Sequence, residues 1–220
     1  MKRSARRLLT LLLCACLITG LLPVTAWAAN FPSEFYASVT YKYESNTKYE
    51  IFGTVTQSAD TLTYSRTGEK MDRVVYGMEY AGGVFFTVEG NKLPRNEDDG
   101  LRELRMYNSD LTNFRTIGTV NDVNGSYWIV DTAMDLSGEE PALYGTYQAL
   151  GVVGGQLAYC SYICSISLTD GTTSNWLQVT GIPSTDIIYA MAFDEDGTMY
   201  AIGADAGDNG GPATLYTIDK

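Results

Sequence analysis

Three segments of similar sequence recur along the chain, and they limit the folds that it can adopt. They read VVYGMEYAGGVFFTV, IVDTAMDLSGEEPALYGTY and IIYAMAFDEDGTMYAIG, starting at positions 74, 129 and 187. In each, a small residue precedes a methionine, and Met78, Met134 and Met191 lie 56 and 57 residues apart. A turn through Gly or acidic residues follows. The next run then carries an aromatic residue, at Phe86, Tyr144 and Tyr200.

Short runs rich in Val, Ile, Thr, Tyr and Phe, separated by Gly, Asp and Asn clusters, predict strands and no helix after residue 29. Third strands are expected at 104–108, 165–169 and 215–219, and fourth strands at 114–118 and 176–180. Four short antiparallel strands repeated at this interval are typical of a propeller blade, which buries its two faces against neighbouring blades. We therefore expect an all-β, propeller-like array of about three recognisable units and a degenerate N-terminal one, incomplete as a ring.

The run IIYAMAFDEDGTMYAIG, with ATLYTID after it, resembles a blade of the secreted bacterial β-propeller proteins, especially those of Gram-positive anaerobes. The resemblance covers residues 73–220 and implies a fold rather than an activity. Propellers of this kind often precede immunoglobulin-like or surface-anchoring modules. Because closed propellers have about 4 to 8 blades, we expect the chain to be the front part of a longer protein with further domains C-terminal to it.

Residues 1–28 are predicted to be a signal peptide. Lys2, Arg3, Arg6 and Arg7 precede an apolar run over 8–22, and Ala26 and Ala28 have the spacing that signal peptidase accepts. The alternatives are a retained membrane anchor or lipid attachment at Cys14 or Cys16. Residues 29–72 then form a β segment, either a degenerate unit or a strand that clasps the ring by supplying a missing outer strand. The repeat units are placed at 73–128, 129–186 and 187–220.

Charge and composition exclude several classes of function. Removal of the signal peptide leaves 11 Lys and Arg against 26 Asp and Glu, a net charge of −15. Such a chain repels nucleic-acid phosphates and anionic membranes, so we expect neither as a partner. The chain has no His, which excludes Ser-His and Cys-His catalysis and His-ligated zinc. A secreted protein, free or attached to the cell surface, is expected.

Two cysteines, Cys160 and Cys164, remain after signal removal. Alternation of side chains places both thiols on one face of a predicted strand. Four residues of strand span ~13 Å, which is too long for a disulfide. We expect two buried free thiols. A disulfide would require a bulge or turn between the two residues.

Candidate ligand-binding residues lie where the longest loops of a propeller would gather on one face. The loops are expected at 89–103, 147–156 and 203–213, joined by 118–127 and 180–186. The candidates are Asp98, Asp99, Asp122, Tyr127, Trp128, Asp131, Asp205 and Asp208.

The candidates fall into two chemical types. Tyr127 and Trp128 could form an aromatic platform for a sugar or peptide; alternatively, Trp128 begins an inner strand and belongs to the core. The acidic stretches 96–100 and 205–209 are rich in oxygen ligands but lack the spacing of a calcium loop, so the alternative is a solvated loop. Residues 194–197 are predicted to form a hairpin turn. No cofactor is expected, with calcium as the one metal considered.

The function expected is a non-catalytic binding or interaction module that recognises a glycan or a protein on its long-loop face. One alternative is a carbohydrate-active propeller enzyme that uses two facing carboxylates. Its candidates are Asp122, Asp131, Asp135 and Asp186, near the predicted inner strands, although no residue is assigned a catalytic role. The other alternative is a structural spacer in a larger surface protein.

Overall fold

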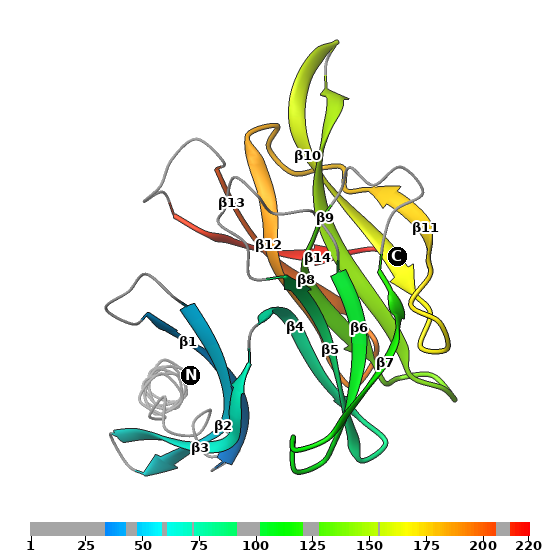
Figure 1. Cartoon of the computed structure of the whole chain (residues 1–220). Helices are drawn as coiled ribbons and strands as arrows, with labels where there is room; N and C mark the ends of the chain where they lie inside the picture. Colours follow the sequence, from blue (N-terminus) through cyan, green and yellow to red (C-terminus); the bar gives the residue numbers. More distant parts are fainter. Residues whose placement is uncertain are drawn as a thin grey trace, which may run out of the picture. The chain divides into compact units, whose positions relative to one another are not determined.

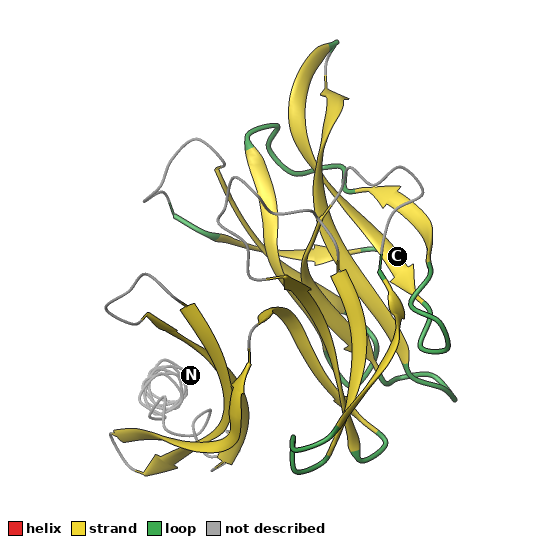
Figure 2. Ribbon diagram, viewed as in Figure 1, coloured by secondary structure: helices red, strands yellow, loops and turns green. Residues whose placement is uncertain are grey.

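The structure of the chain is a computed structural model that describes residues 34–42, 48–58, 61–71, 73–91, 102–120, 128–153, 155–205 and 212–220. Within these ranges the chain forms strands and turns, with no helix (Figure 2). The all-β prediction is therefore confirmed. No described helix is long and apolar enough to cross a bilayer. The predicted signal peptide, residues 1–28, lies outside the described residues.

The chain divides into two compact units, Met1–Phe35 with Val55–Tyr64 and Tyr36–Thr54 with Ser65–Lys220. Strands β1 (Glu34–Lys42), β2 (Lys48–Ser58) and β3 (Thr61–Met71) belong partly to each unit. They pair only with one another, in the order β1-β2-β3, and form the N-terminal sheet. The interpretation of residues 29–72 as a degenerate unit or as a strand that supplies a missing outer strand stays a prediction.

Three further antiparallel sheets follow in chain order (Figure 1). The first sheet comprises β4 (Arg73–Ala81), β5 (Val84–Asn91), β6 (Arg102–Asn108) and β7 (Phe114–Thr119). The second comprises β8 (Trp128–Asp135), β9 (Ala142–Val153), β10 (Gln156–Ile166) and β11 (Thr173–Gln178). The third comprises β12 (Asp186–Phe193), β13 (Met199–Asp205) and β14 (Thr214–Ile218). In each sheet, strands adjacent in sequence are adjacent in space.

The strand register shows that the three sheets are structural repeats. The first strand of each has a bulge, at Tyr76, Val130 and Tyr189. Counted from the bulge, Phe86, Tyr144 and Tyr200 occupy equivalent positions, as the sequence predicted.

The sequence alignment of Met78, Met134 and Met191 was less accurate. Met78 and Met191 are equivalent, whereas Met134 lies two positions further from its bulge. A shift of two positions keeps a side chain on the same face of its strand. All three methionines therefore still belong to the face that packs against the preceding sheet.

The hairpins between third and fourth strands repeat the same turn chemistry. Asp110 Oδ1 accepts hydrogen bonds from the backbone N–H and hydroxyl of Thr112, at 3.1 and 2.7 Å. Asp170 Oδ1 accepts the same pair from Thr172, at 3.0 and 2.8 Å. The residue between them has positive φ in both turns, 58° at Leu111 and 77° at Gly171. Such side-chain bonds satisfy backbone groups that the turn removes from the ladder.

The second sheet differs from the prediction in its central hairpin. Residues 147–156 were expected to be a loop, and the third strand was expected at 165–169. Instead β9 extends to Val153 and β10 begins at Gln156, with the two strands paired from Leu143↔Ile166 to Val153↔Gln156. Gly155, with φ of 83°, allows the tight turn between them. The result is a long hairpin that projects beyond the rest of its sheet (Figure 1).

Each pair of consecutive sheets shares a hydrophobic core. Val88 and Leu104 of the first sheet pack with Ile129, Met134 and other residues of the second. In the same way, Ala133 and Ile163 of the second sheet pack with core residues of the third. A third cluster joins Phe85 and Tyr107 to Phe52 of β2, within the same compact unit.

The first strands of consecutive sheets approach closely, β4 next to β8 and β8 next to β12. A Cβ atom on Gly77 would lie 1.9 Å from Thr132 Oγ1, so only glycine permits this approach of β4 to β8. At the outer end of the same interface, a Cβ on Gly118 would lie 1.7 Å from the carbonyl oxygen of Asp170. These glycines set the spacing of the first and second sheets.

Both cysteines lie on β10, buried and unpaired, as expected. We predict that iodoacetamide modifies neither thiol in the native protein and both in denaturant, because burial excludes the reagent and raises the pKa of Cys164 to about 12. Intact-mass measurement with and without urea tests this. A native protein that gains either adduct within minutes, or a mass that shows an internal disulfide, would contradict the buried-thiol arrangement.

Candidate functional site

Carboxylates on the first strands of two sheets, β4 and β8, connect each sheet to the next. Asp131, on β8, accepts a hydrogen bond at its Oδ2 from the backbone N–H of Met191 on β12, at 2.6 Å. Burial raises the pKa of Asp131 to about 6. Because this bond joins two sheets, Asp131 holds β12, the first strand of the third sheet, against β8, the first strand of the second sheet.

Glu79 plays the corresponding part between the first two sheets, although the sequence did not single it out. Its Oε1 accepts a hydrogen bond from the Thr132 hydroxyl at 3.3 Å, and its carboxylate accepts another from the backbone of Met134. Burial, together with the Asp131 carboxylate, raises the pKa of Glu79 to about 7. The two acids thus form an electrostatically coupled pair that can hold a proton near neutral pH.

The other described carboxylate candidates engage different groups. Asp135, at the end of β8, accepts hydrogen bonds from Lys220 and Ser137, which lower its pKa to about 2. Asp186, at the start of β12, accepts a hydrogen bond from the Tyr216 hydroxyl at 2.6 Å. Asp135 lies ~13 Å along the strand from Asp131, and Asp186 is the first residue of β12, five positions before Met191. Asp131, Asp135 and Asp186 therefore do not form a facing pair.

Of the predicted ligand-binding residues, the structure describes Trp128, Asp131 and Asp205, and all three lie on strands. Trp128 is the first residue of β8, and Asp205 is the last residue of β13. The remaining predicted residues lie outside the described part of the chain, and they are Asp98, Asp99, Asp122, Tyr127 and Asp208. Residues 194–197 form the predicted hairpin turn, in which Asp194 Oδ1 accepts a hydrogen bond from Thr198 N–H at 2.8 Å.

A buried charge network on the first sheet was not predicted. Glu89 is 0% exposed, and its Oε1 accepts hydrogen bonds from Thr87 Oγ1 at 2.7 Å and Tyr107 Oη at 2.6 Å. Its other oxygen lies 3.1 Å from Arg105 Nη1. Arg105 also pairs with Glu103 at 2.8 Å. The sequence signal that could have found it is the alternation of Thr87 and Glu89 on the core-facing positions of a strand.

The register also identifies apolar residues that no described sheet covers. Val88 and Leu104 are paired in the first sheet, and their equivalents are Thr146 and Ile163 in the second. These four residues are between 0% and 7% exposed, because the next sheet covers them. The equivalents in the third sheet, Ile202 and Leu215, are 45% and 67% exposed. We call this pair the third-sheet face.

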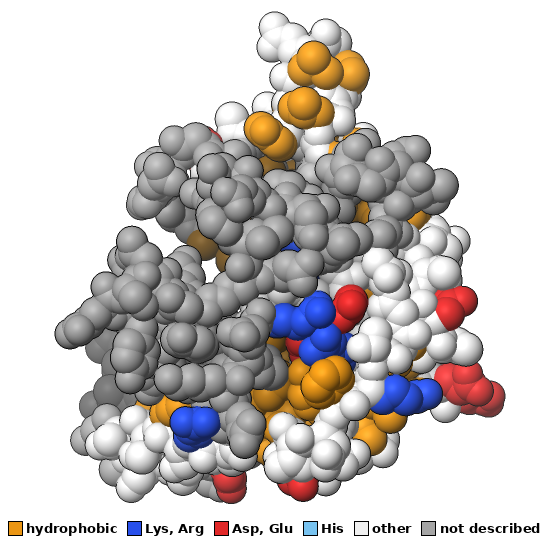
Figure 3. Space-filling model, viewed as in Figure 1, with side chains coloured by type: hydrophobic (Ala, Val, Ile, Leu, Met, Phe, Trp, Pro, Cys, Tyr) orange, Lys and Arg blue, Asp and Glu red, His pale blue; other side chains and the backbone are white. Residues whose placement is uncertain are grey.

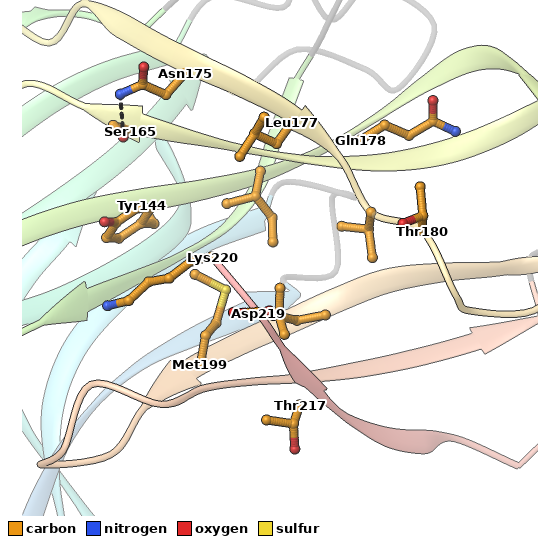
Figure 4. Close-up of a pocket in the computed structure, with 13 residues that line it drawn as sticks. Tyr144, Ser165, Asn175, Leu177, Gln178, Thr180, Met199, Thr217, Asp219 and Lys220 are labelled. Carbon is orange, nitrogen blue, oxygen red and sulfur yellow. Dashed lines mark hydrogen bonds between the residues drawn. The ribbon is translucent and has the colours of Figure 1, made fainter.

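A cleft of about 710 Å³ opens beside the third sheet. Its apolar wall includes Tyr144, Ile163, Met199 and Ile218, which belong to or pack against the core between the second and third sheets. Leu177 of β11 lines the second-sheet side, and Asp219 and Lys220 line the side that follows β14 (Figure 4). Its polar lining residues include Asn175, Gln178 and Thr180.

Apolar side chains also gather at the end of the projecting β9–β10 hairpin (Figure 3). They form two cross-strand pairs, Leu150 with Tyr159 and Val152 with Leu157. Each of the four is at least 59% exposed. The hairpin, the third-sheet face and the cleft are the exposed apolar features that surround the second and third sheets.

Neither a known family model nor a curated protein matches this chain. Within the described ranges, no group of three Cys, Asp or Glu side chains is arranged to hold a metal ion. The chemistry that these residues offer is therefore apolar contact, backbone pairing and the inter-sheet carboxylates.

The raised pKa of Glu79 predicts a pH-dependent stability. The folded protein binds this proton more tightly than the unfolded chain, so the free energy of unfolding should fall as pH rises from 4.5 to about 7. Glu79→Gln keeps an accepting oxygen without the charge, so it should lose this part of the slope. Above pH 7 it should be the more stable protein, by up to about 3 kcal/mol.

Urea unfolding at about pH 5, 6.5 and 8 measures the slope. Glu139→Gln, at an exposed turn, is the matched control and should keep the wild-type slope. If Glu79→Gln and the wild type lose stability in parallel as pH rises, Glu79 does not carry the buried proton.

The buried network predicts a second effect. Glu89→Gln removes the negative charge opposite Arg105 and replaces one accepting oxygen of the carboxylate with an NH2 donor, so it should lower the free energy of unfolding by about 2 kcal/mol. Denaturant unfolding at pH 7 measures the loss against Glu139→Gln, for which we expect no change. Equal stabilities for the two variants would show that the network contributes nothing to folding.

Proposed function

We propose that this chain is a non-catalytic interaction module, a propeller-type array of stacked sheets that binds a protein partner. The predicted signal segment, residues 1–28, supports a place outside the cell, at or near the cell surface. The observation that carries the proposal is the third-sheet face. Ile202 and Leu215 occupy positions that a following sheet covers in both earlier repeats, yet here they remain exposed.

The chemistry of this face favours another β-sheet as the partner. In the two internal interfaces, the covering sheet contributes a methionine from its first strand, Met134 or Met191, to an apolar core. Aliphatic side chains bury well against such a sheet, at ~25 cal/mol per Å² of apolar surface. A glycan would instead require an aromatic platform with polar groups beside it. Glycan binding remains the alternative proposal, with Tyr127 and Trp128 as the aromatic platform predicted on the long-loop face.

The enzyme alternative has less support. The described carboxylates with raised pKa values, Glu79 and Asp131, accept backbone hydrogen bonds from the adjoining sheet. A carboxylate used in this way is engaged in holding two strands together, whereas a glycosidase needs two acids that face a substrate.

In a solution of the purified chain, a second copy supplies the sheet that the third-sheet face can bind. We predict reversible dimerisation between about 1 and 200 µM. Ile202→Lys with Leu215→Lys should weaken it at least about tenfold, because two ammonium groups would be desolvated at the interface. Sedimentation velocity measures the association, and far-UV circular dichroism checks the fold.

Leu136→Lys is the control, since Leu136 is a 55% exposed leucine on the β8–β9 turn. It should dimerise as the wild type does. A wild-type chain that stays monomeric over this range would overturn the proposal, and so would a double variant that dimerises unchanged.

A further inference from the structure

In the described part of the chain the third sheet has three strands, whereas the first and second sheets each have a fourth strand. In the first sheet β7 pairs with β6, and in the second β11 pairs with β10, both antiparallel. Among the described strands, β14 pairs with β13 alone. One edge of β14 therefore offers a row of backbone N–H and C=O groups, which is a template for another strand.

The second sheet shows what a fourth strand does in this repeat. β11 pairs with β10 through Ile163↔Leu177 and Tyr162↔Gln178. It also places Trp176 in the core between the first and second sheets, with its ring 4.3 Å from that of Tyr147 in an edge-to-face contact. The fourth strand thus closes the outer part of the interface with a large side chain.

The equivalent space between the second and third sheets is the 710 Å³ cleft. Figure 4 shows β11 on one side of it and the end of β14 on the other. Tyr144, Ile163, Met199 and Ile218 form its apolar wall, as Tyr147 and its neighbours do around Trp176. Ligand-sized cavities measure about 300–1,000 Å³, so the cleft has room for a large side chain and the backbone that carries it.

We propose that this cleft and the free edge of β14 form one binding site for an extended peptide segment of a partner protein. The segment adds to β14 as an antiparallel fourth strand and inserts an aromatic or large apolar residue into the cleft. This is strand addition, in which backbone hydrogen bonds supply affinity and a pocket for alternate side chains supplies specificity. The site differs from the third-sheet face, because it uses the backbone edge of β14 and the cleft rather than the side chains of Ile202 and Leu215.

The internal repeat also identifies the chemistry of the peptide. The strand that fills the equivalent place is TSNWLQ, in which Trp176 and Leu177 are large apolar residues and the other four are polar. Residues 172–181, TTSNWLQVTG, made as a fluorescein-labelled peptide, are therefore a direct probe. We expect saturable binding in the micromolar range, about 1–100 µM, by fluorescence anisotropy.

Two comparisons test the cleft. Leu177→Lys changes a 61% exposed leucine that lines it, so the variant should fold normally and bind the peptide at least about tenfold more weakly. Leu136→Lys, at a similarly exposed leucine away from the cleft, should bind as the wild type does. A peptide with Asp in place of the Trp should not bind, because a carboxylate would be buried among apolar groups.

Hydrogen exchange tests the strand addition itself. Bound peptide should slow exchange of the backbone amides of β14, because half of them gain a partner at the free edge. Absence of binding at about 1 mM peptide, equal binding by Leu177→Lys, or binding without protection of β14 would each overturn the proposal. Ile202→Lys alone, on β13 and outside the free edge of β14, should weaken dimerisation and still bind the peptide, so failure of dimerisation and failure of this site are distinguishable.

Discussion

The close approach of consecutive inner strands is the contact on which this architecture depends. A four-stranded sheet has two faces and cannot bury both by itself, so each sheet here relies on the next. The absence of a side chain at Gly77 lets β4 approach Thr132 on β8, and the Glu79 carboxylate bridges the same two strands. Asp131 repeats the bridge from β8 to β12. Stacking, burial and the shifted acid pKa values all follow from this spacing.

The same principle explains why the exposed apolar residues are informative. Exposed hydrophobic residues are common on protein surfaces and individually mean little. Ile202 and Leu215 are different, because the positions equivalent to theirs in both other repeats are buried. Comparison with the first two sheets therefore shows which residues of the third sheet another sheet could cover. The same comparison underlies the interpretation of the cleft beside β14.

Asp131 shows how packing between sheets gives a residue a role that its place in the sequence does not predict. Asp131 is a sequence candidate for ligand binding or for a carboxylate pair because it lies near a predicted inner strand. In the structure its carboxylate accepts a hydrogen bond from the Met191 backbone N–H, and its charge helps to raise the pKa of Glu79. A half-buried acid with a backbone donor is stabilised where it lies. Its raised pKa results mainly from desolvation, which is a consequence of stacking.

The sequence by itself determined the features that depend on neighbouring residues. Alternating β-branched and aromatic residues predicted the strands, Asp and Gly predicted the hairpin at 194–197, and the repeat interval predicted three similar units. The equivalence of Phe86, Tyr144 and Tyr200 and the burial of Cys160 and Cys164 follow from the same local patterns. A pattern of period two is visible in any single strand.

Only the tertiary structure decided what depends on contacts between sheets. The register offset of Met134, the extension of β9 to Val153, the Glu89 network and the partners of Glu79 were not predictable, because each is set by residues far away in sequence. The ligand-binding role of the loops expected at 89–103, 118–127 and 203–213 remains a prediction from the sequence. Burial of a strand's second face is decided by the sheet that covers it, and no single repeat carries that information in its own residues.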